Sequence, residues 1–292
     1  MSQVPASDTL REWRESASYW KKHARNTRIM FSPLTAALVE EAGIREDQTV
    51  LDVAGGPGEP SLTIAGVVGP RGSVTCTDAV AEMVAAAESE ARRRGLTNLE
   101  FRQCAAERLP FVSDSFDIVL SRLGVMFSPE PAAALREMLR VTKPGGALSL
   151  AVWGRSELNP YFYIVTRVMS RYVETPPADP AAPGAFRFAE PGDLARLLRE
   201  AGAMDVRERL LEFRLEAPLS LVEFWIVRSE ISGTLREKLE TLPSEERIQV
   251  AQEVMTETRP FFRDGRMSFP AQAIIVSGRK PSQSKDRPGD RL

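Results

Sequence analysis

Short apolar segments alternate with longer segments of helical pattern between residues 49 and 153. The apolar segments, which we expect to be strands, are 49–54, 73–77, 99–103, 116–121 and 147–153. Helical patterns lie between them, after Glu59 and at 79–94 and 131–141. A strand that returns in the same direction needs a crossover, usually a helix, so this alternation predicts an α/β fold with a parallel sheet and helices on both faces.

The rest of the chain does not continue this alternation. The first 43 residues are expected to be helical from residue 8 on and to be broken in two by Pro33, which lacks an N–H group. After residue 153 we expect helices at 159–173 and 193–202, two further helices within 219–262, a long strand at 204–215 and a last strand at 273–278.

The composition is that of an ordinary globular protein, with 43% hydrophobic and 27% charged residues. Because 38 Lys and Arg residues face 40 Asp and Glu residues, charge alone does not direct the chain to nucleic acid or anionic lipid. No apolar segment is long enough to span a bilayer, and the first residues lack the pattern of a signal peptide. The two cysteines show no metal-ligand spacing, so we expect no metal site and a reducing, cytoplasmic location.

The segment VLDVAGGPGEPS at 50–61 leads from an expected strand through a glycine-rich turn into a helix. Gly56 and Gly58 allow the backbone to approach a ligand closely. Asp78 follows the second expected strand, where an acidic side chain can accept both hydroxyl groups of a ribose. Each feature also has a purely structural interpretation, the turn as a plain loop and Asp78 as a helix N-cap. Together they predict a Rossmann-like nucleotide-binding unit.

Three segments resemble the class I S-adenosylmethionine-dependent methyltransferases, in particular those of the ubiquinone and menaquinone biosynthesis type. They are LDVAGGPG at 51–58, RLPFVSDSFDIV at 108–119 and LRVTKPGG at 139–146, in the family's order. The resemblance covers about residues 45 to 155 and is specific for the superfamily, not for a substrate. With the late strand signals, it implies a seven-stranded sheet in which 273–278 runs antiparallel beside 204–215.

The resemblance also implies a binding site for S-adenosylmethionine, which the reaction converts to S-adenosylhomocysteine. The glycine-rich turn and Ser121 would hold the methionine part, Asp78 the ribose, and the backbone after the third strand the adenine edge. The residues expected to bind the cofactor are Asp52 (through water or its backbone), Ala54, Gly55, Gly56, Gly58, Asp78, Ala79, Met83, Ala105, Ala106 and Ser121.

The sequence departs from the family's pattern within this site. The family often has Gly at the position of Ala54 and Thr at that of Pro57, and both replacements suit a turn because Ala is small and Pro favours turns. Many relatives have an Asp at the position of Ala105, where its carboxylate binds the adenine amino group. Its loss removes a contact worth on the order of 1 kcal/mol, for which Glu107 or Gln103 would compensate.

The sequence offers no catalytic triad or carboxylate pair, and methyl transfer needs none because the cofactor brings the reactivity. His23, the only histidine, is a candidate general base, with a surface or interface histidine as the alternative. Arg122 follows the fourth strand and is a candidate for holding an acidic or phenolate group of the acceptor. Pairing with a structural carboxylate is its alternative role.

The aromatic-rich segment 8–31 needs an apolar surface on which to bury its rings. The carboxyl edge of the sheet is the nearest surface where burial would also exclude water from the reaction. We therefore expect this segment to be a lid over the cofactor, with Arg28 in the acceptor pocket. Trp153 and Phe162, which follow the fifth strand, are the other expected pocket residues, with a helix-core role as the alternative.

The expected fold is thus a Rossmann-like α/β domain with a seven-stranded, mostly parallel sheet, an N-terminal helical lid and a C-terminal helical insertion. We expect the lid at 1–44, the cofactor-binding core at 45–155, cap helices with the last two strands at 156–280, and a disordered tail at 281–292. The expected activity is methyl transfer to O, C or N of a small lipophilic or aromatic acceptor. A cofactor-binding protein without transferase activity and an NAD(P)-dependent oxidoreductase are the alternatives, and the oligomeric state, a homodimer included, stays open.

Overall fold

The computed structural model describes residues 6–174, 179 and 181–282, so the expected tail lies almost wholly outside the described residues. The α-helices are α1 (Ala6–Lys22), α2 (Ala24–Ala42), α3 (Ser61–Val68), α4 (Ala81–Arg94), α5 (Pro131–Val141), α6 (Pro160–Met169), α7 (Asp193–Glu200), α8 (Leu221–Ile231), α9 (Gly233–Glu240) and α10 (Ser244–Thr258). The strands are β1 (Thr49–Val53), β2 (Ser73–Asp78), β3 (Leu99–Gln103), β4 (Phe116–Arg122), β5 (Thr142–Trp153), β6 (Met204–Ala217), β7 (Phe262–Arg263) and β8 (Arg266–Arg279).

The strands form one sheet in the order β3-β2-β1-β4-β5-β8-β6, and the two-residue strand β7 pairs with β8. The pairs from β3 to β5 are parallel, whereas β8 runs antiparallel to both β5 and β6. The expected α/β class, the mostly parallel sheet and the place of the antiparallel strand beside β6 are therefore confirmed. The short β7 is an eighth strand that the sequence pattern did not indicate.

The central strands β1, β2 and β4 are buried on both faces, as their apolar sequences require, whereas the edge strands β3 and β6 are largely exposed. Val50 in β1 and Ile118 in β4 belong to one apolar cluster with residues of α2 and α3, while Leu51 and Val119 belong to a second with residues of α5 and α7. Successive side chains of a strand point to opposite faces. The two layers of helices leave the carboxyl ends of the strands uncovered between them, and this edge holds the site described below.

The expected break of the N-terminal helical segment at Pro33 is wrong. Pro33 lies inside α2, and the break falls at His23, between α1 and α2. A proline inside a helix leaves the carbonyl group four residues earlier without its backbone donor. Here the hydroxyl group of Ser32 donates to the carbonyl oxygen of Ile29, at 2.8 Å, so this acceptor is satisfied and the helix continues.

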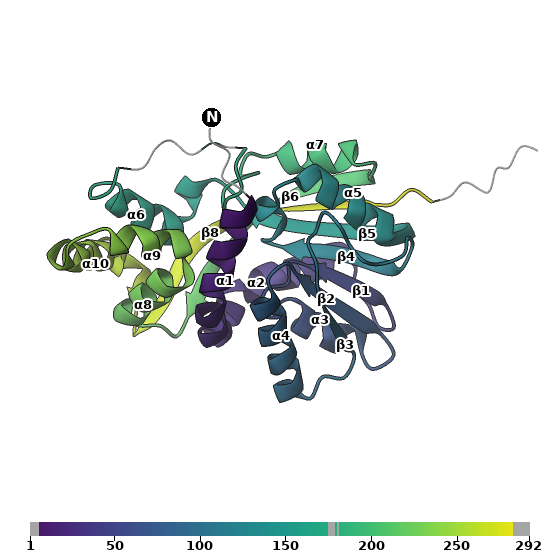
Figure 1. Cartoon of the computed structure of the whole chain (residues 1–292), viewed down its shortest axis with the longest axis horizontal. Coiled ribbons are helices and arrows are strands. Elements are labelled where there is room, and N and C mark those ends of the chain that lie inside the picture. Colours follow the sequence, from purple (N-terminus) through teal and green to yellow (C-terminus); the bar gives the residue numbers. More distant parts are fainter. Residues whose placement is uncertain (1–5, 175–178, 180, 283–292) are drawn as a thin grey trace, which may run out of the picture.

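The segment 219–262 contains three α-helices, α8, α9 and α10, not the expected two. With α6 they gather at the far end of the long strands β6 and β8, which extend beyond the rest of the sheet (Figure 1). We call α6 and α8–α10 the cap. The helix α1 stands between the cap and the sheet in this view and packs against α4, α8 and α9 (Figure 1).

Candidate functional site

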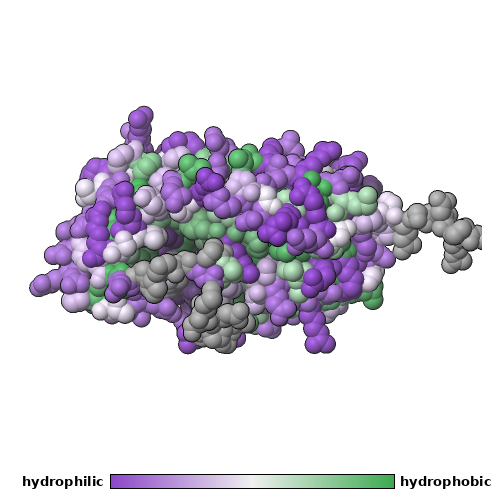
Figure 2. Space-filling view, turned by 90° about the horizontal axis from the view of Figure 1, so that it is seen from above, coloured by the Kyte–Doolittle hydropathy of each residue, from purple (hydrophilic) through white to green (hydrophobic). Residues whose placement is uncertain are grey.

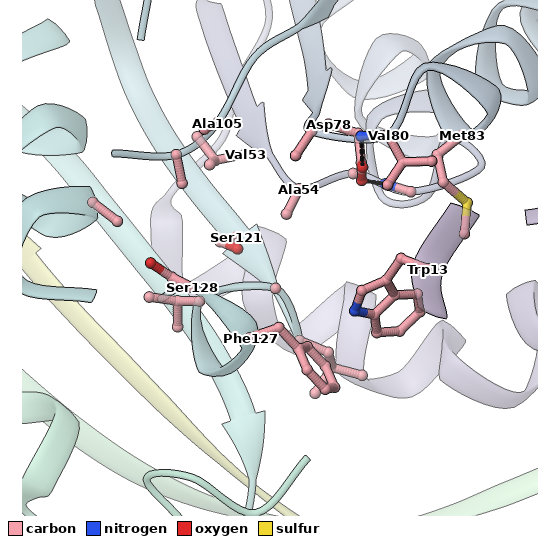
Figure 3. A pocket seen from close by; sticks show the side chains of 18 of the residues that line it. Trp13, Val53, Ala54, Asp78, Val80, Met83, Ala105, Ser121, Phe127 and Ser128 are labelled. Atoms are coloured by element: carbon pink, nitrogen blue, oxygen red, sulfur yellow. Dashed lines mark hydrogen bonds between the residues drawn. The ribbon is translucent and has the colours of Figure 1, made fainter. Parts of the chain in front are cut away.

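A cavity of about 350 Å³ lies at the carboxyl ends of β1, β2, β3 and β4, where ligands bind in open α/β sheets. Its wall contains nine of the eleven residues expected to bind the cofactor. They are Ala54, Gly55, Gly56, Asp78, Ala79, Met83, Ala105, Ala106 and Ser121. Figure 3 shows how side chains from these different strand ends point toward one space.

The glycine-rich turn is held from below by Asp52. This carboxylate is fully buried, and its Oδ2 atom accepts hydrogen bonds from the backbone N–H and the hydroxyl group of Ser61, at 3.1 and 2.6 Å. A Cβ atom on Gly55 would lie 2.8 Å from the same oxygen and 2.6 Å from Cys76 Sγ, so only glycine fits above it. Asp52 therefore lies behind the turn and not in the cavity wall.

Burial raises the pKa of Asp52 to about 7, against the hydrogen bonds from Ser61 and the charge of Arg122, which lower it. Its second oxygen, Oδ1, is buried without a hydrogen-bond partner. This group therefore changes charge near neutral pH at the base of the turn.

Asp78 joins the ends of β1 and β2. Its Oδ2 atom accepts a hydrogen bond from Gly56 N–H, at 3.0 Å, and its Oδ1 atom accepts one from Val80 N–H, at 2.9 Å (Figure 3). Burial raises the pKa of Asp78, although these backbone donors act in the opposite direction. Gly56 has φ +55°, a conformation that glycine adopts at little cost. The N-cap of α4 is Val80, so Asp78 orders the loop before the helix and faces the cavity.

Ala54 has φ +59°, in the left-handed region that costs an alanine roughly 1–2 kcal/mol. The backbone is thus strained at this position, which often carries Gly in the family. Opposite Ala54, the Ser121 hydroxyl group is buried, lines the cavity and has no hydrogen-bond partner (Figure 3). A buried hydroxyl without a partner is rare in folded proteins, so Ser121 Oγ marks a place where a polar ligand atom fits.

The third strand end contributes Ala105, Ala106 and Glu107 to the wall. The Glu107 carboxylate accepts a hydrogen bond from the Ser128 hydroxyl group, and both residues line the cavity. Gln103 turns away, since its side-chain amide donates to the carbonyl oxygen of Ala79 at 3.1 Å. Of the two polar residues expected to replace the missing Asp, Glu107 alone is among the lining residues.

The lid side of the cavity is aromatic. Trp13 of α1 lies edge-on to Phe127, with ring centroids 4.9 Å apart, and 5.8 Å from Trp20 (Figure 3). Ala17 of α1 packs with Val80 and Met83, so the helix closes over the strand end that carries Asp78. These contacts place α1 beside the cavity, and its role as a lid stays a prediction.

Arg122 lines the cavity from the end of β4, and no carboxylate among the described residues forms an ion pair with it. Its Nη1 atom donates to the Thr35 hydroxyl group at 2.5 Å and its Nη2 atom to the carbonyl oxygen of Glu59 at 2.9 Å. Burial lowers its pKa, and the charges of Glu59 and Asp52 act against this. Arg122 thus ties α2 to the glycine-rich turn.

The structure separates several expected site residues from this cavity. His23 is buried, and its Nε2 atom lies 2.6 Å from Oε2 of Glu230 in the cap. Arg28 lines a different cavity, between α2 and α3. Trp153 and Phe162 pack against each other, with ring centroids 5.0 Å apart, and Gly58 packs on Leu62 behind the turn.

Other lining residues were not singled out from the sequence. Phe127 and Phe31 contribute rings, and Glu59 contributes a carboxylate that is paired with Arg94 at 3.0 Å. The signal for Phe127 was its position just after the fourth strand. Phe31 and Glu59 had no signal, because their approach to the cavity depends on how α2 and α3 pack.

The sheet order, the glycine-rich turn and an acid at the end of β2 define a class I methyltransferase fold with a site for an adenosine-containing cofactor. A family described as a methyltransferase domain matches residues 44–172. Residues 44–172, which are less than half of the chain, therefore match a methyltransferase domain, and this similarity implies S-adenosylmethionine as the cofactor.

Curated relatives agree over this part of the chain. Rv1405c of Mycobacterium tuberculosis, an uncharacterised protein, is 40% identical over 124 residues, which are 42% of this chain and 44% of that protein. The ubiquinone/menaquinone biosynthesis C-methyltransferase UbiE of Proteus mirabilis is 36% identical over 123 residues, 42% of this chain and 49% of that enzyme. The similarity thus spans less than half the length of these relatives.

Solved structures share the fold over more of the chain. The YcgJ protein from Bacillus subtilis has a TM-score of 0.53 and 21% identity, over 85% of this chain and 98% of that chain. The cyclase SpnF has a TM-score of 0.50 and 21% identity, over 86% of this chain and 81% of that chain. Among the described residues, no helix has the length and apolar character to cross a membrane.

Proposed function

We propose that the protein transfers the methyl group of S-adenosylmethionine to an oxygen, carbon or nitrogen atom of a small lipophilic or aromatic acceptor. The observation that carries this proposal is the buried, unpartnered hydroxyl group of Ser121 in a cavity that the glycine-rich turn and Asp78 also line. Such a cavity offers polar atoms for the methionine part and the ribose of the cofactor and a largely apolar wall for its adenine.

The residues present fit the cofactor. Asp78 would accept hydrogen bonds from the ribose hydroxyls on the lone pairs that Gly56 and Val80 leave free. Ala54, Gly55, Gly56 and Ser121 would hold the methionine part, and Ala79, Met83, Ala105 and Ala106 would surround the adenine. Asp52 and Gly58 would act on the cofactor indirectly, because both lie behind the turn.

We further propose that Glu107 takes over the contact that an Asp at position 105 makes in relatives. Its carboxylate lines the same end of the cavity as Ala105 and Ala106. A carboxylate can accept from the adenine amino group while it accepts from Ser128, because it has about four lone-pair positions.

When bound, the cofactor supplies a sulfonium methyl group that is reactive without activation by the protein. The chain's own residues would then orient the acceptor and exclude water. Trp13 and Phe127 would close the cavity on the lid side, since their rings meet edge-on across it. Arg122 would keep α2 and the turn together and would contact the acceptor only from the cavity wall.

The test has two stages. Calorimetry with S-adenosylmethionine and S-adenosylhomocysteine measures binding, and formation of S-adenosylhomocysteine is then followed with a panel of phenols, hydroquinones, aromatic acids and amines. Binding together with product formation on at least one acceptor supports the proposal. Absence of binding would contradict it.

The second candidate is a cofactor-binding protein without transferase activity. Two observations favour it: no catalytic base is evident in the described part of the cavity, and a cyclase shares this fold. Tight binding without product formation on any acceptor class would support this alternative.

A further inference from the structure

Arg228, on α8 in the cap, is a buried arginine without a carboxylate partner among the residues that the structure describes. Arg228 is 7% exposed, and its Nε atom is buried without a hydrogen-bond partner. Burial lowers the pKa of Arg228, and the neighbouring Tyr161 acts against this through its charge and through side-chain hydrogen bonding. A buried cation without a counter-charge costs folding free energy.

The guanidinium group lies between two aromatic rings of α6. Its Cζ atom is 5.0 Å from the ring centroid of Tyr161 and 5.2 Å from that of Phe162. The Tyr161 hydroxyl group is also buried without a hydrogen-bond partner, and burial raises its pKa to about 12, so it stays a donor at neutral pH. Arg228 Nε and Tyr161 Oη are therefore two neighbouring donors that lack a hydrogen-bond partner in apolar surroundings.

Two series of contacts connect the surroundings of Arg228 with the cofactor cavity. Ile231 follows Arg228 by three positions on α8, so both lie on one face, and its carbonyl oxygen accepts a hydrogen bond from Trp20 of the cavity wall at 3.1 Å. On the other side, Phe31 of the cavity wall contacts Trp153, with ring centroids 5.8 Å apart, and Trp153 contacts Phe162.

Seen from above, the molecule is hollowed between the cap and the sheet, and the side chains visible in the hollow are hydrophobic (Figure 2). An apolar hollow between two lobes is a usual place for an organic ligand. Of the two rings beside Arg228, Tyr161 is buried and Phe162 is partly exposed, so a ligand would reach Arg228 from the side of Phe162.

We infer that Arg228 is a specificity residue that recognises a carboxylate on the methyl acceptor, together with Tyr161. This rests on the function proposed above and narrows its substrate class to aromatic or other flat lipophilic carboxylic acids. The two carboxylate oxygens accept from Arg228 Nε and Tyr161 Oη, the two donors that lack partners. Phe162, which is only partly buried, is the ring that turns aside for the ligand.

The test compares two probes that differ only in charge. Calorimetry on the full chain, with and without S-adenosylhomocysteine, measures the affinity of 2-naphthoate and of neutral 2-naphthylmethanol. We expect the wild-type protein to bind naphthoate about tenfold more tightly, and Arg228→Met to abolish this preference while binding of the neutral probe stays within about twofold. Equal binding of both probes, no binding of naphthoate, or an unchanged preference in Arg228→Met would overturn the inference.

The matched control is Arg167→Met, which removes an arginine that also lies over a tyrosine of α6, 5.4 Å from the Tyr163 ring, but is exposed and paired with Glu257. It should keep the preference for naphthoate. The melting temperature separates recognition from a structural role, because removing an unpaired buried charge should leave the protein as stable or more stable. A marked loss of stability with unchanged probe preference would show that Arg228 is structural.

Failure of the proposed function and failure of this inference would give different experimental results. A wild-type protein that binds no S-adenosylhomocysteine contradicts the function, whereas the naphthoate comparison without cofactor decides the role of Arg228.

Discussion

The wall that the sheet gives to the cavity and the wall that α1 gives to it are built in different ways. At the strand ends, Asp52 and Asp78 are held by backbone N–H groups and by one serine, all within residues 52–80. On the other side, Trp13 of α1 meets Phe127 across more than 100 residues of sequence, and α1 is itself held to the cap by the hydrogen bond from Trp20 to Ile231. Local hydrogen bonds make the first wall rigid, while the second depends on how whole helices pack.

The largest expected effect tests the sheet wall. Asp78→Ala should weaken cofactor binding about 100-fold or more, because two charge-assisted hydrogen bonds are each worth roughly 1.5–3 kcal/mol. Asp78→Asn should lose less, since its one side-chain oxygen can still accept from a backbone N–H group of the turn. Calorimetry checks both variants, and unchanged affinity in a folded Asp78→Ala protein would leave Asp78 with only its loop-ordering role.

The second prediction concerns the pH dependence of the unfolding free energy that Asp52, directly behind this wall, causes. The pKa of Asp52 is about 7 in the folded protein, above its unfolded value, so its stabilising contribution is complete at low pH and is lost as the pH rises toward and through 7. Relative to Asp52→Asn, the cofactor-free wild-type protein should lose about 2–3 kcal/mol of unfolding free energy between pH 5 and pH 8.

Urea unfolding at both pH values measures this difference. Asp117→Asn is the control with the opposite sign, because burial would raise the pKa of Asp117 but the hydrogen bonds from Lys143 and Thr49 and the charge of Lys143 together lower it. The contribution of Asp117 is therefore present above its unfolded pKa and is lost only toward acid, below pH 5. A pH dependence of the wild type equal to that of Asp52→Asn would contradict a raised pKa of Asp52.

The third effect tests the lid wall. Trp13→Ala removes the ring that meets Phe127 and should lower turnover about tenfold, since aromatic pairs contribute roughly 0.5–1.5 kcal/mol beyond the area they bury. Arg14→Ala, at the neighbouring exposed position, should leave turnover unchanged. The point variant is a better test than a long truncation, because residues from Ala24 on belong to α2, whose buried face is part of the core. Full turnover in Trp13→Ala would make α1 an accessory.

The smallest effect is expected at His23. Its ring pairs with Glu230 outside the described cavity wall, so His23→Ala should change turnover by less than about twofold and leave the pH–rate profile unaltered. Lys22 and His23 lower the pKa of Glu230 through their hydrogen bonds and charges, against the effect of burial, which raises it. These contacts fit a structural link between the lid and the cap. Loss of one limb of the pH–rate profile in the variant would restore His23 as a base.

The elements of the sheet wall were predictable because their signals are local. A strand, a glycine-rich turn and an acid after the next strand lie within about 30 consecutive residues, as in any nucleotide-binding βα unit, and the structure places nine of the expected residues around one cavity. Asp52, at the end of β1, and Gly58, in the turn, lie away from the cavity instead, because the path of the backbone decides which residues face the ligand space.

The sequence by itself determined the α/β sheet, since apolar periodicity and turn chemistry act between neighbours in the chain, and its resemblance to the methyltransferases implied the antiparallel strand and the expected cofactor residues. Only the tertiary structure decided that α2 continues through Pro33, that Arg28 and His23 lie away from the cavity, and that Arg228 sits unpaired between two rings. Those outcomes depend on which helix faces meet, and a contact between residues about 60 to 200 positions apart leaves no periodic trace in the sequence.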